Sequence, residues 1–263
     1  MNKIAILLSG HIRNLHEHIN NFKENVLNIL KQNNYDYDIY IHTWDDNLTK
    51  DIIYAKDKFF KKDTVNVPLL FKQVKIPLKK IIIENQEKKT KDMQLSLYLD
   101  KTCKKSYLQG KYNENELRDL TKKLFWQFYG HYKVLEMIDD PNIYTHIIKT
   151  RPDVYYDIFD ISLLQQNTFF PDSHRYNGIC INQVFFGGKK EYMIKILQYF
   201  STLIYQNQNQ EINDSIASTY KKSGITFNTL FKHYITNYLK LEVLYTKYNP
   251  KIYRTKNNML ELN

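Results

Sequence analysis

A strand, a helix and a second strand follow one another within residues 1–44, and this pattern limits the fold more than any other part of the chain. Residues 4–8 are all apolar, as in a central parallel strand that is covered on both faces. Ser9, Gly10 and His11 end it. A strand rich in β-branched and aromatic residues is predicted over 37–44. A parallel pair with a right-handed crossover follows from this order. The helix between the strands, of about four turns, carries its apolar side chains on one side: Leu15, Ile19, Phe22, Val26, Leu27 and Leu30.

The rest of the chain continues the alternation of strands and helices. The clearest helix is predicted over 114–138, where apolar residues recur every three, four or seven positions, and Pro141 stops it. Residues 85–115 are polar and lysine-rich without a clear period, which indicates an irregular excursion with a short helix at 95–99 as an alternative. Further strands are predicted at 74–84, 144–150 and 183–186, the last closed by Gly187 and Gly188, and further helices at 190–204 and 227–239.

Length and composition fit one globular domain. A chain of 263 residues buries one substantial core, and its 22 Tyr, 14 Phe and 2 Trp exclude the aromatic-poor composition of disordered chains. We expect an α/β domain over 1–263 with a helical C-terminal part from about 189. The apolar run at 4–8 is too short to span a bilayer. Cys103 and Cys180 lie far apart and are expected to be free thiols in a reducing, cytoplasmic compartment.

The positive charge of the chain is concentrated in one stretch. The formal net charge is +10, and the excess lies between Lys50 and Lys111, which contains no arginine. A solvated surface is the simplest interpretation. Attraction to an anionic membrane, a diphosphate-linked acceptor or nucleic acid is the alternative. Lysine without arginine favours diffuse attraction over shaped phosphate recognition.

Three segments are predicted to meet beyond the carboxyl ends of the strands, where open α/β sheets bind ligands: 9–14, 42–46 and 150–153. Gly10 makes a turn before a helix, so backbone N–H groups there are suited to phosphate, with Arg13 near by. One glycine is not a dinucleotide fingerprint, and no Walker sequence is present. An ordinary strand-to-helix turn is the alternative.

Asp153 follows a strand and Pro152, whose fixed φ makes the backbone rigid. A carboxylate in this position is suited to a hard divalent cation, Mn²⁺ or Mg²⁺, that neutralises a departing diphosphate. Arg151 is suited to stabilise the same charge directly. The alternative is a structural Arg–Asp pair that ties the loop.

Several motifs in order resemble a family of small GT-A-type glycosyltransferases from bacterial surface-glycan loci and large viruses. The motifs are S-G-x-x-R at 9–13, D-x-x-I-H-T-W at 38–44, an aromatic-rich helix at 125–129, R-x-D at 151–153 and (D/N)-Q-x-x-x-G at 182–187. The match covers residues 3 to about 200. It implies a GT-A-type, Rossmann-like fold with a mainly parallel sheet flanked by helices.

The resemblance also implies roles for residues. Ser9, Gly10, His11 and Arg13 would line the nucleotide-diphosphate pocket. The base and ribose would lie at Thr43, Trp44 and Asp45. Asp153 would stand for the last carboxylate of the D-x-D motif of metal-dependent members.

The sequence departs from the family pattern at two positions. Arg151 occupies the first acidic position of D-x-D, and Asn182 stands where the family carries Asp. A neutral amide is no general base. Asp172 and Asp157 are therefore the candidate bases, and Gln183 is expected to orient the donor or acceptor sugar.

The remaining candidates are weaker. His16 and His18 are expected to be exposed helix residues, and His42 to be a satisfied core histidine. The aromatic stripe at 125–132 is expected to be core, with sugar stacking as the alternative.

The sequence thus predicts transfer of a sugar from a nucleotide-diphospho-sugar, a UDP-sugar above all, to a hydroxyl of a glycan or lipid-linked acceptor, with Mn²⁺ or Mg²⁺ as cofactor. A sugar nucleotidyltransferase is the competing enzyme class, but its glycine-rich triphosphate loop is absent. Two further functions compatible with the sequence are a non-enzymatic, basic nucleic-acid-binding protein and a catalytically silent GT-A domain.

Overall fold

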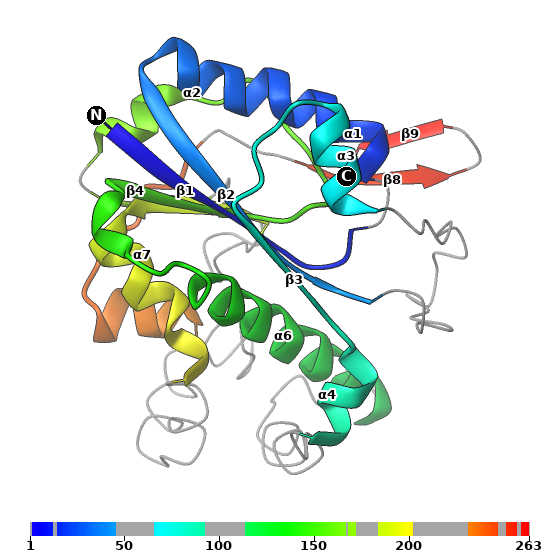
Figure 1. Cartoon of the computed structure of the whole chain (residues 1–263). Helices are drawn as coiled ribbons and strands as arrows, with labels where there is room; N and C mark the ends of the chain where they lie inside the picture. Colours follow the sequence, from blue (N-terminus) through cyan, green and yellow to red (C-terminus); the bar gives the residue numbers. More distant parts are fainter. Residues whose placement is uncertain are drawn as a thin grey trace.

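The computed structural model is an α/β fold built around a mixed sheet whose strands are mainly parallel (Figure 1). The described residues are 2–12, 15–45, 66–92, 114–166, 168–171, 184–201, 231–246, 251–256 and 259–262. In this part of the chain the main sheet has six strands in the order β3-β2-β1-β4-β7-β6. Among the same residues, no helix is long and apolar enough to cross a membrane.

The predicted strand–helix–strand start is confirmed. Strand β1 spans Asn2–Ser9 and β2 spans Tyr35–Trp44, and the two are parallel in register Ile4 to Tyr37 and Ser9 to His42. The intervening helix is continuous in direction but changes its winding: α1 (Leu15–Phe22), a π-helical turn η1 (Lys23–Leu27) and α2 (Asn28–Gln32).

The strand order reverses next to β1. Strand β3 (Lys80–Glu84) pairs parallel with β2, whereas β4 (His146–Thr150) pairs parallel with the other edge of β1. The strands after β1 are therefore added first on one side of it, as β2 and β3, and then on its other side, as β4. In open α/β sheets such a switch point is where loops from neighbouring strands separate and ligands bind.

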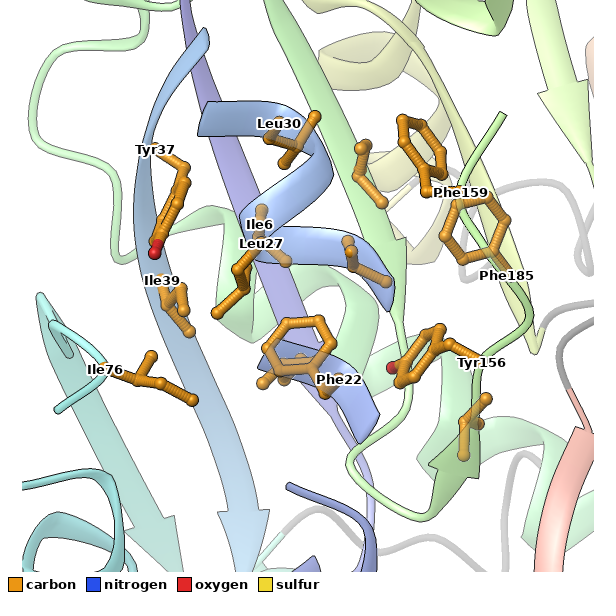
Figure 2. Packing of buried hydrophobic residues seen from close by; sticks show 14 of the residues in the cluster. Ile6, Phe22, Leu27, Leu30, Tyr37, Ile39, Ile76, Tyr156, Phe159 and Phe185 are labelled. Atoms are coloured by element: carbon orange, nitrogen blue, oxygen red, sulfur yellow. The ribbon is translucent and has the colours of Figure 1, made fainter. Parts of the chain in front are cut away.

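One face of the sheet is covered by α1, η1, α2 and α3 (Val67–Gln73), and Figure 2 shows the core beneath them. Every second residue of β1, namely Ile4, Ile6 and Leu8, faces this side. All six apolar positions of the predicted helix are buried there. Each such large side chain contributes about 1.5–3 kcal/mol when it leaves water, so the amphipathic stripe fixes the helix on the sheet.

The opposite face is covered by α6 (Glu114–Leu135), α7 (Lys190–Leu197) and the π-helical turn η5 (Tyr234–Tyr238) (Figure 1). Its core contains Ala5 and Leu7 of β1 together with aromatic side chains of α6. The helix predicted over 114–138 is thus confirmed, and it ends three residues early. Pro141 instead begins a short 3-10 turn, η3 (Pro141–Ile143), which the Asp140 side chain caps.

Two sequence predictions about loops and glycines are wrong. The stretch 86–92 is not irregular but forms helix α4 (Gln86–Asp92). Gly187 and Gly188 do not close a strand but lie inside β7 (Phe185–Lys189). A Cβ on Gly187 would lie 2.7 Å from the Phe170 ring, and one on Gly188 would lie 2.8 Å from the Thr168 carbonyl oxygen. Close packing, not a turn, therefore requires these glycines.

The sheet is completed by β7, which overlaps the strand predicted at 183–186, and by one further strand that was not predicted. Strand β7 runs antiparallel to β4, and β6 (Phe169–Pro171) runs antiparallel to β7. The 3-10 turn η4 (Ile161–Gln165) precedes β6. A second, small sheet joins β5 (Val154–Tyr155) to the hairpin of β8 (Lys251–Lys256) and β9 (Met259–Leu262). The helix predicted at 190–204 begins as expected, and the alternative helix at 95–99 lies outside the described residues.

Candidate functional site

The turns that follow β1 and β4 meet at the switch point. Gly10 has φ +132°, a backbone conformation that favours glycine. A Cβ at this position would lie 3.7 Å from Cδ of Pro152. The Gly10 N–H donates to the His42 carbonyl at 3.2 Å, which ties the first turn to β2. The prediction that segments 9–14, 42–46 and 150–153 meet is confirmed for the residues that the structure describes.

Arg151 and Asp153 form a bidentate ion pair in the turn after β4. Nε of Arg151 donates to Oδ1 of Asp153 at 2.7 Å, and Nη2 donates to Oδ2 at 2.6 Å. The Asp153 side chain is 1% exposed and that of Arg151 is 17% exposed. The carboxylate is therefore an interior group that holds the guanidinium, and the guanidinium is the member of the pair that reaches the surface.

One side of the α1–η1 helix anchors this turn. Nε2 of His18 lies 2.6 Å from the Pro152 carbonyl oxygen, to which only an N–H can donate, so Nε2 carries the proton. Asn21 exchanges two hydrogen bonds with the backbone of Tyr156, and Asn25 donates a third to the same residue. The expectation that His18 is exposed is wrong, because the helix turns it toward Pro152.

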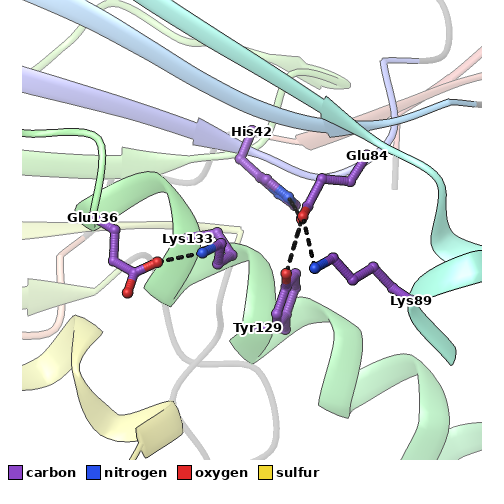
Figure 3. Close-up of polar contacts among 6 residues, drawn as sticks. All are labelled: His42, Glu84, Lys89, Tyr129, Lys133 and Glu136. Carbon is purple, nitrogen blue, oxygen red and sulfur yellow. Dashed lines mark hydrogen bonds and ion pairs between the residues drawn. The ribbon is translucent and has the colours of Figure 1, made fainter. Parts of the chain in front are cut away.

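A polar cluster lies at the carboxyl ends of β2 and β3 (Figure 3). We call His42, Glu84, Lys89 and Tyr129 the His42 cluster. The carboxylate of Glu84 lies 2.8 Å from Nε2 of His42, and the Tyr129 hydroxyl donates to it at 3.0 Å. Nζ of Lys89 lies 3.4 Å from the other oxygen. Side chains of three elements, β2, α6 and α4, thus converge on the one carboxylate that β3 carries.

These contacts set the charge of Glu84. Burial raises its pKa, but the hydrogen bonds from His42 and Tyr129 and the charge of Lys89 more than offset this effect and lower the pKa to about 2. Burial and the negative charge of Glu84 raise the pKa of Tyr129. Glu84 is therefore a carboxylate and an acceptor throughout the physiological pH range, and Tyr129 is its donor.

Aromatic rings surround the cluster on the α6 face. The ring of Trp44 stacks on Tyr129 with centroids 5.8 Å apart and meets Trp126 edge-on at 5.2 Å. Trp44 is 5% exposed. Thr43 points to the opposite face, since successive strand residues alternate, and it is also buried. The interpretation of the aromatic stripe as core is confirmed for Phe125, Trp126, Phe128 and Tyr129.

Buried basic groups lie near Arg151, and they were not predicted from the sequence. Lys149 is 0% exposed, and its Nζ lies 5.8 Å from the centroid of the Phe186 ring. Burial, followed by the positive charges of Lys149 and Arg151, holds the pKa of His131 well below its usual value. The alternation of β4 gives the signal: Ile147 and Lys149 share one face, so a lysine there must enter the α6 core.

The structure brings together some of the predicted site residues and not others. Ser9, Gly10, His11, Arg151 and Asp153 lie at the switch point, and Asp45 follows β2, where its N–H donates to the Glu84 carbonyl at 2.7 Å. Asp157 is an exposed residue beyond β5. The remaining predicted residues lie outside the described residues: Arg13, Asp172, Asn182 and Gln183.

The surroundings of Asp153 do not suit a divalent cation. Both carboxylate oxygens accept hydrogen bonds from Arg151, and a metal ion at either oxygen would face the guanidinium charge. Among the residues that the structure describes, no three His, Cys, Asp or Glu side chains form a metal-binding group. The metal cofactor stays a prediction, and Asp153 is assigned to holding Arg151.

No protein-family model and no curated protein sequence matches the chain. The resemblance to GT-A-type glycosyltransferases therefore remains an expectation from the five motifs. What supports a function is the geometry of the strand ends and the chemistry of the residues there.

Proposed function

We propose that the chain is a GT-A-type glycosyltransferase, which moves a sugar from a nucleotide-diphospho-sugar, first of all a UDP-sugar, to a hydroxyl of a glycan acceptor. The observation that carries the proposal is the switch point beside β1. There the Gly10 turn contacts the Pro152 turn, and a buried carboxylate holds an arginine at the same edge.

An oriented arginine supports a diphosphate ligand. The guanidinium is planar and permanently charged, and it recognises phosphate oxygens through paired N–H donors. Asp153 engages Nε and Nη2, so the plane of the group is fixed before a ligand arrives. A group that is fixed beforehand loses little conformational entropy on binding. The turn at Gly10 adds a backbone without a side chain, which allows close approach.

The proposed chemistry uses these groups as charge stabilisers. As the bond between the sugar and the diphosphate breaks, negative charge grows on the leaving oxygen, and a cation positioned there lowers the barrier. Arg151 has this role in the proposal, and Asp153 orients it. A divalent metal ion would add further neutralisation of the diphosphate. Under this proposal the lysine-rich stretch at 50–111 attracts a lipid-linked acceptor or an anionic membrane surface.

A charge-neutral replacement of the ion pair tests the proposal. Arg151→Met alone leaves Asp153 buried without its partner, which costs about 3–5 kcal/mol of stability. The double variant Arg151→Met with Asp153→Leu removes both charges, and such replacements are often neutral or stabilising. We expect the double variant to fold with a Tm near that of the wild type. Its affinity for the donor should fall by about 10–100-fold, because a charged hydrogen bond is worth about 1.5–3 kcal/mol.

Isothermal calorimetry against UDP-glucose, UDP-galactose and UDP-N-acetylglucosamine, with and without Mn²⁺, gives the measurement. Binding of one of these donors by the wild type, weakened in the folded double variant, supports the proposal. Equal affinity of the two proteins would remove Arg151 from the site. No binding of any nucleotide sugar by the wild type would overturn the proposed function.

A further inference from the structure

The protonation state of the His42 ring follows from its hydrogen bond to Glu84. Nε2 of His42 lies 2.8 Å from a carboxylate oxygen, which only accepts. Nε2 therefore carries the ring proton. In neutral His42 the other ring nitrogen, Nδ1, then has an unshared electron pair and is the basic atom. A carboxylate on the far side of the ring also stabilises the imidazolium that forms when Nδ1 takes up a proton.

Nδ1 of His42 is buried and has no hydrogen-bond partner among the described residues. It faces the place where Gly130 of α6 packs on the sheet. A Cβ built on Gly130 would lie 3.4 Å from Nδ1 of His42 and 3.5 Å from Oγ of Ser9. The two side chains thus border the same small space, and Gly130 leaves it open. Ser9 is also the register partner of His42.

This space belongs to the edge of the sheet that carries Arg151. Leu8 pairs with Thr150, so Ser9 and Arg151 are the next residues along two neighbouring strands. Side chains on a strand alternate between faces, and Leu8 faces α1, so Ser9 faces α6, in agreement with its place beside Gly130. Ser9, His42 and Glu84 therefore lie along the strand ends on the α6 side, and Arg151 follows β4 directly after the register partner of Leu8.

We propose that His42 is the proton acceptor of this site and that the Ser9 hydroxyl passes the proton to it. The inference rests on the proposed glycosyl transfer. The acceptor hydroxyl attacks the anomeric carbon and gives its proton to Oγ of Ser9, while Ser9 gives its own proton to Nδ1 of His42. The bond to the diphosphate breaks, and its oxygen keeps the electron pair. Ser9 is then the catalytic residue, and His42 and Glu84 act through it.

Such a relay would supply the base that Asn182 does not provide. Besides Arg151 beside Ser9, charged or titratable side chains of three elements contact the relay among the described residues. Glu84 faces His42 from β3, Tyr129 donates to Glu84 from α6, and Lys89 pairs with Glu84 from α4. Because Glu84 remains ionised, it stays an acceptor for Nε2 of His42 throughout the proposed step.

Replacements at three positions test the relay in the full chain. His42→Gln places an amide donor toward Glu84 but removes the base, and Ser9→Ala removes the hydroxyl. Gly130→Ala puts a methyl group between the two side chains at ordinary contact distance, and alanine is the better helix former. The control is Tyr144→Phe, which removes a part-buried hydrogen bond to Asp38 on the same sheet face but toward the amino ends of the strands.

The readouts are UDP release from the UDP-sugar that binds, with water or a methyl glycoside as acceptor, donor affinity and Tm. A positioned base contributes about 10²–10⁴-fold. We therefore expect kcat to fall at least about 100-fold in His42→Gln and Ser9→Ala. In Gly130→Ala kcat should fall while Tm is unchanged or raised. Donor affinity should change little in His42→Gln and Gly130→Ala. The control should keep the wild-type kcat.

The pH profile and the ring tautomer separate a proton acceptor from a merely structural histidine. A general base stops working when it is protonated, so a fall of kcat toward acid pH in the wild type should be absent in His42→Gln. ¹⁵N NMR of the wild type should show His42 with its proton on Nε2. Unchanged kcat and pH profile in His42→Gln, or a proton on Nδ1, would overturn the relay and leave the proposed function standing if the wild type still binds donor. Absence of donor binding by the wild type would overturn both.

Discussion

The same face of β2 carries two polar clusters, and they differ in how completely their atoms are paired. Toward the amino ends of the strands, Asp38 accepts from the Tyr144 hydroxyl at 2.6 Å and pairs with Lys3 at 2.9 Å. The Tyr40 hydroxyl completes this Asp38 cluster through Tyr144 at 2.7 Å. Within the described residues no buried side-chain atom of this cluster lacks a partner, whereas His42 of the other cluster leaves Nδ1 unpaired.

Under the proposed relay, the Asp38 cluster stabilises the fold and the His42 cluster leaves one atom for a proton transfer. A buried polar atom without a partner costs about 1–3 kcal/mol, so a purely structural cluster is expected to close its hydrogen bonds, as the Asp38 cluster does. In the His42 cluster, by contrast, Nδ1 of His42 lies unpaired beside Ser9 and Gly130. Functional sites are where such local costs concentrate.

Neutralising the carboxylates of Glu84 and Asp38 one at a time should give the largest difference between the two clusters. Glu84→Gln and Asp38→Asn each remove a carboxylate that holds charged hydrogen bonds, so each should lower the free energy of unfolding by about 1.5–3 kcal/mol. Under the proposed relay, only Glu84→Gln should also lower kcat, by about 100-fold, because the imidazolium of His42 loses its counter-charge. Urea unfolding and UDP release measure the two effects.

Asp38→Asn is the matched control in this pair. Its kcat should stay within about twofold of the wild type, since effects at separated sites are independent. A comparable loss of kcat in both variants would mean that activity follows stability, and the functional contrast between the clusters would be broken.

The sequence predicted the strands, helix and turns that carry the site better than the contacts between its side chains. The apolar run at 4–8, the stripe from Leu15 to Leu30 and the strand at 37–44 follow simple periods, and their burial confirms them. The turn at Gly10 and the turn at Arg151 could be assigned to one edge because parallel strands end together. The α/β fold class could be predicted from the same strands and helices.

The hydrogen-bond partners of the site residues could not be predicted from the sequence, because they come from distant parts of the chain. Glu84 was recognised only as a strand end, and its contacts with His42 and Tyr129 join positions 42 and 45 residues away. His42 was interpreted as a satisfied core histidine; it is buried, but only Nε2 is paired. The role of Asp153 as a metal ligand stays a prediction, whereas the alternative of an Arg–Asp pair that ties the loop agrees with the two hydrogen bonds from Arg151.

Acid should weaken the fold through buried histidines before it affects either carboxylate cluster. Burial lowers the pKa of His18, His131 and His146 below 6.5, so the unfolded chain binds more protons than the native one just below pH 6.5. The contribution of these histidines to stability is therefore complete above pH 6.5. It falls as the pH decreases, by at most about 1.4 kcal/mol per pH unit for each histidine. In His131→Leu the free energy of unfolding should depend less steeply on pH between 6.5 and 5.

The exposed His16 provides the control, and His16→Gln should leave the slope between pH 7 and 5 unchanged. The carboxylates act in a lower window. The pKa of Glu84 falls from 4.5 to about 2 and that of Asp38 falls below 3.8. Their contribution is present above these ordinary values and is lost toward pH 2. An unfolding free energy that is flat from pH 7 to 5 would contradict the histidine assignment.

The smallest contrast comes from the two tyrosines that donate to the carboxylates. Tyr144→Phe removes a donor at 2.6 Å from Asp38 and leaves the Tyr40 hydroxyl without its partner, so it should cost about 2 kcal/mol. Tyr129→Phe removes a longer bond, and Glu84 keeps His42 and Lys89, so about 1 kcal/mol is expected. Urea unfolding at pH 7 measures both. A larger loss for Tyr129→Phe would show that the His42 cluster is the more tightly coupled of the two, and the assignment of the Asp38 cluster as the structural one would then be wrong.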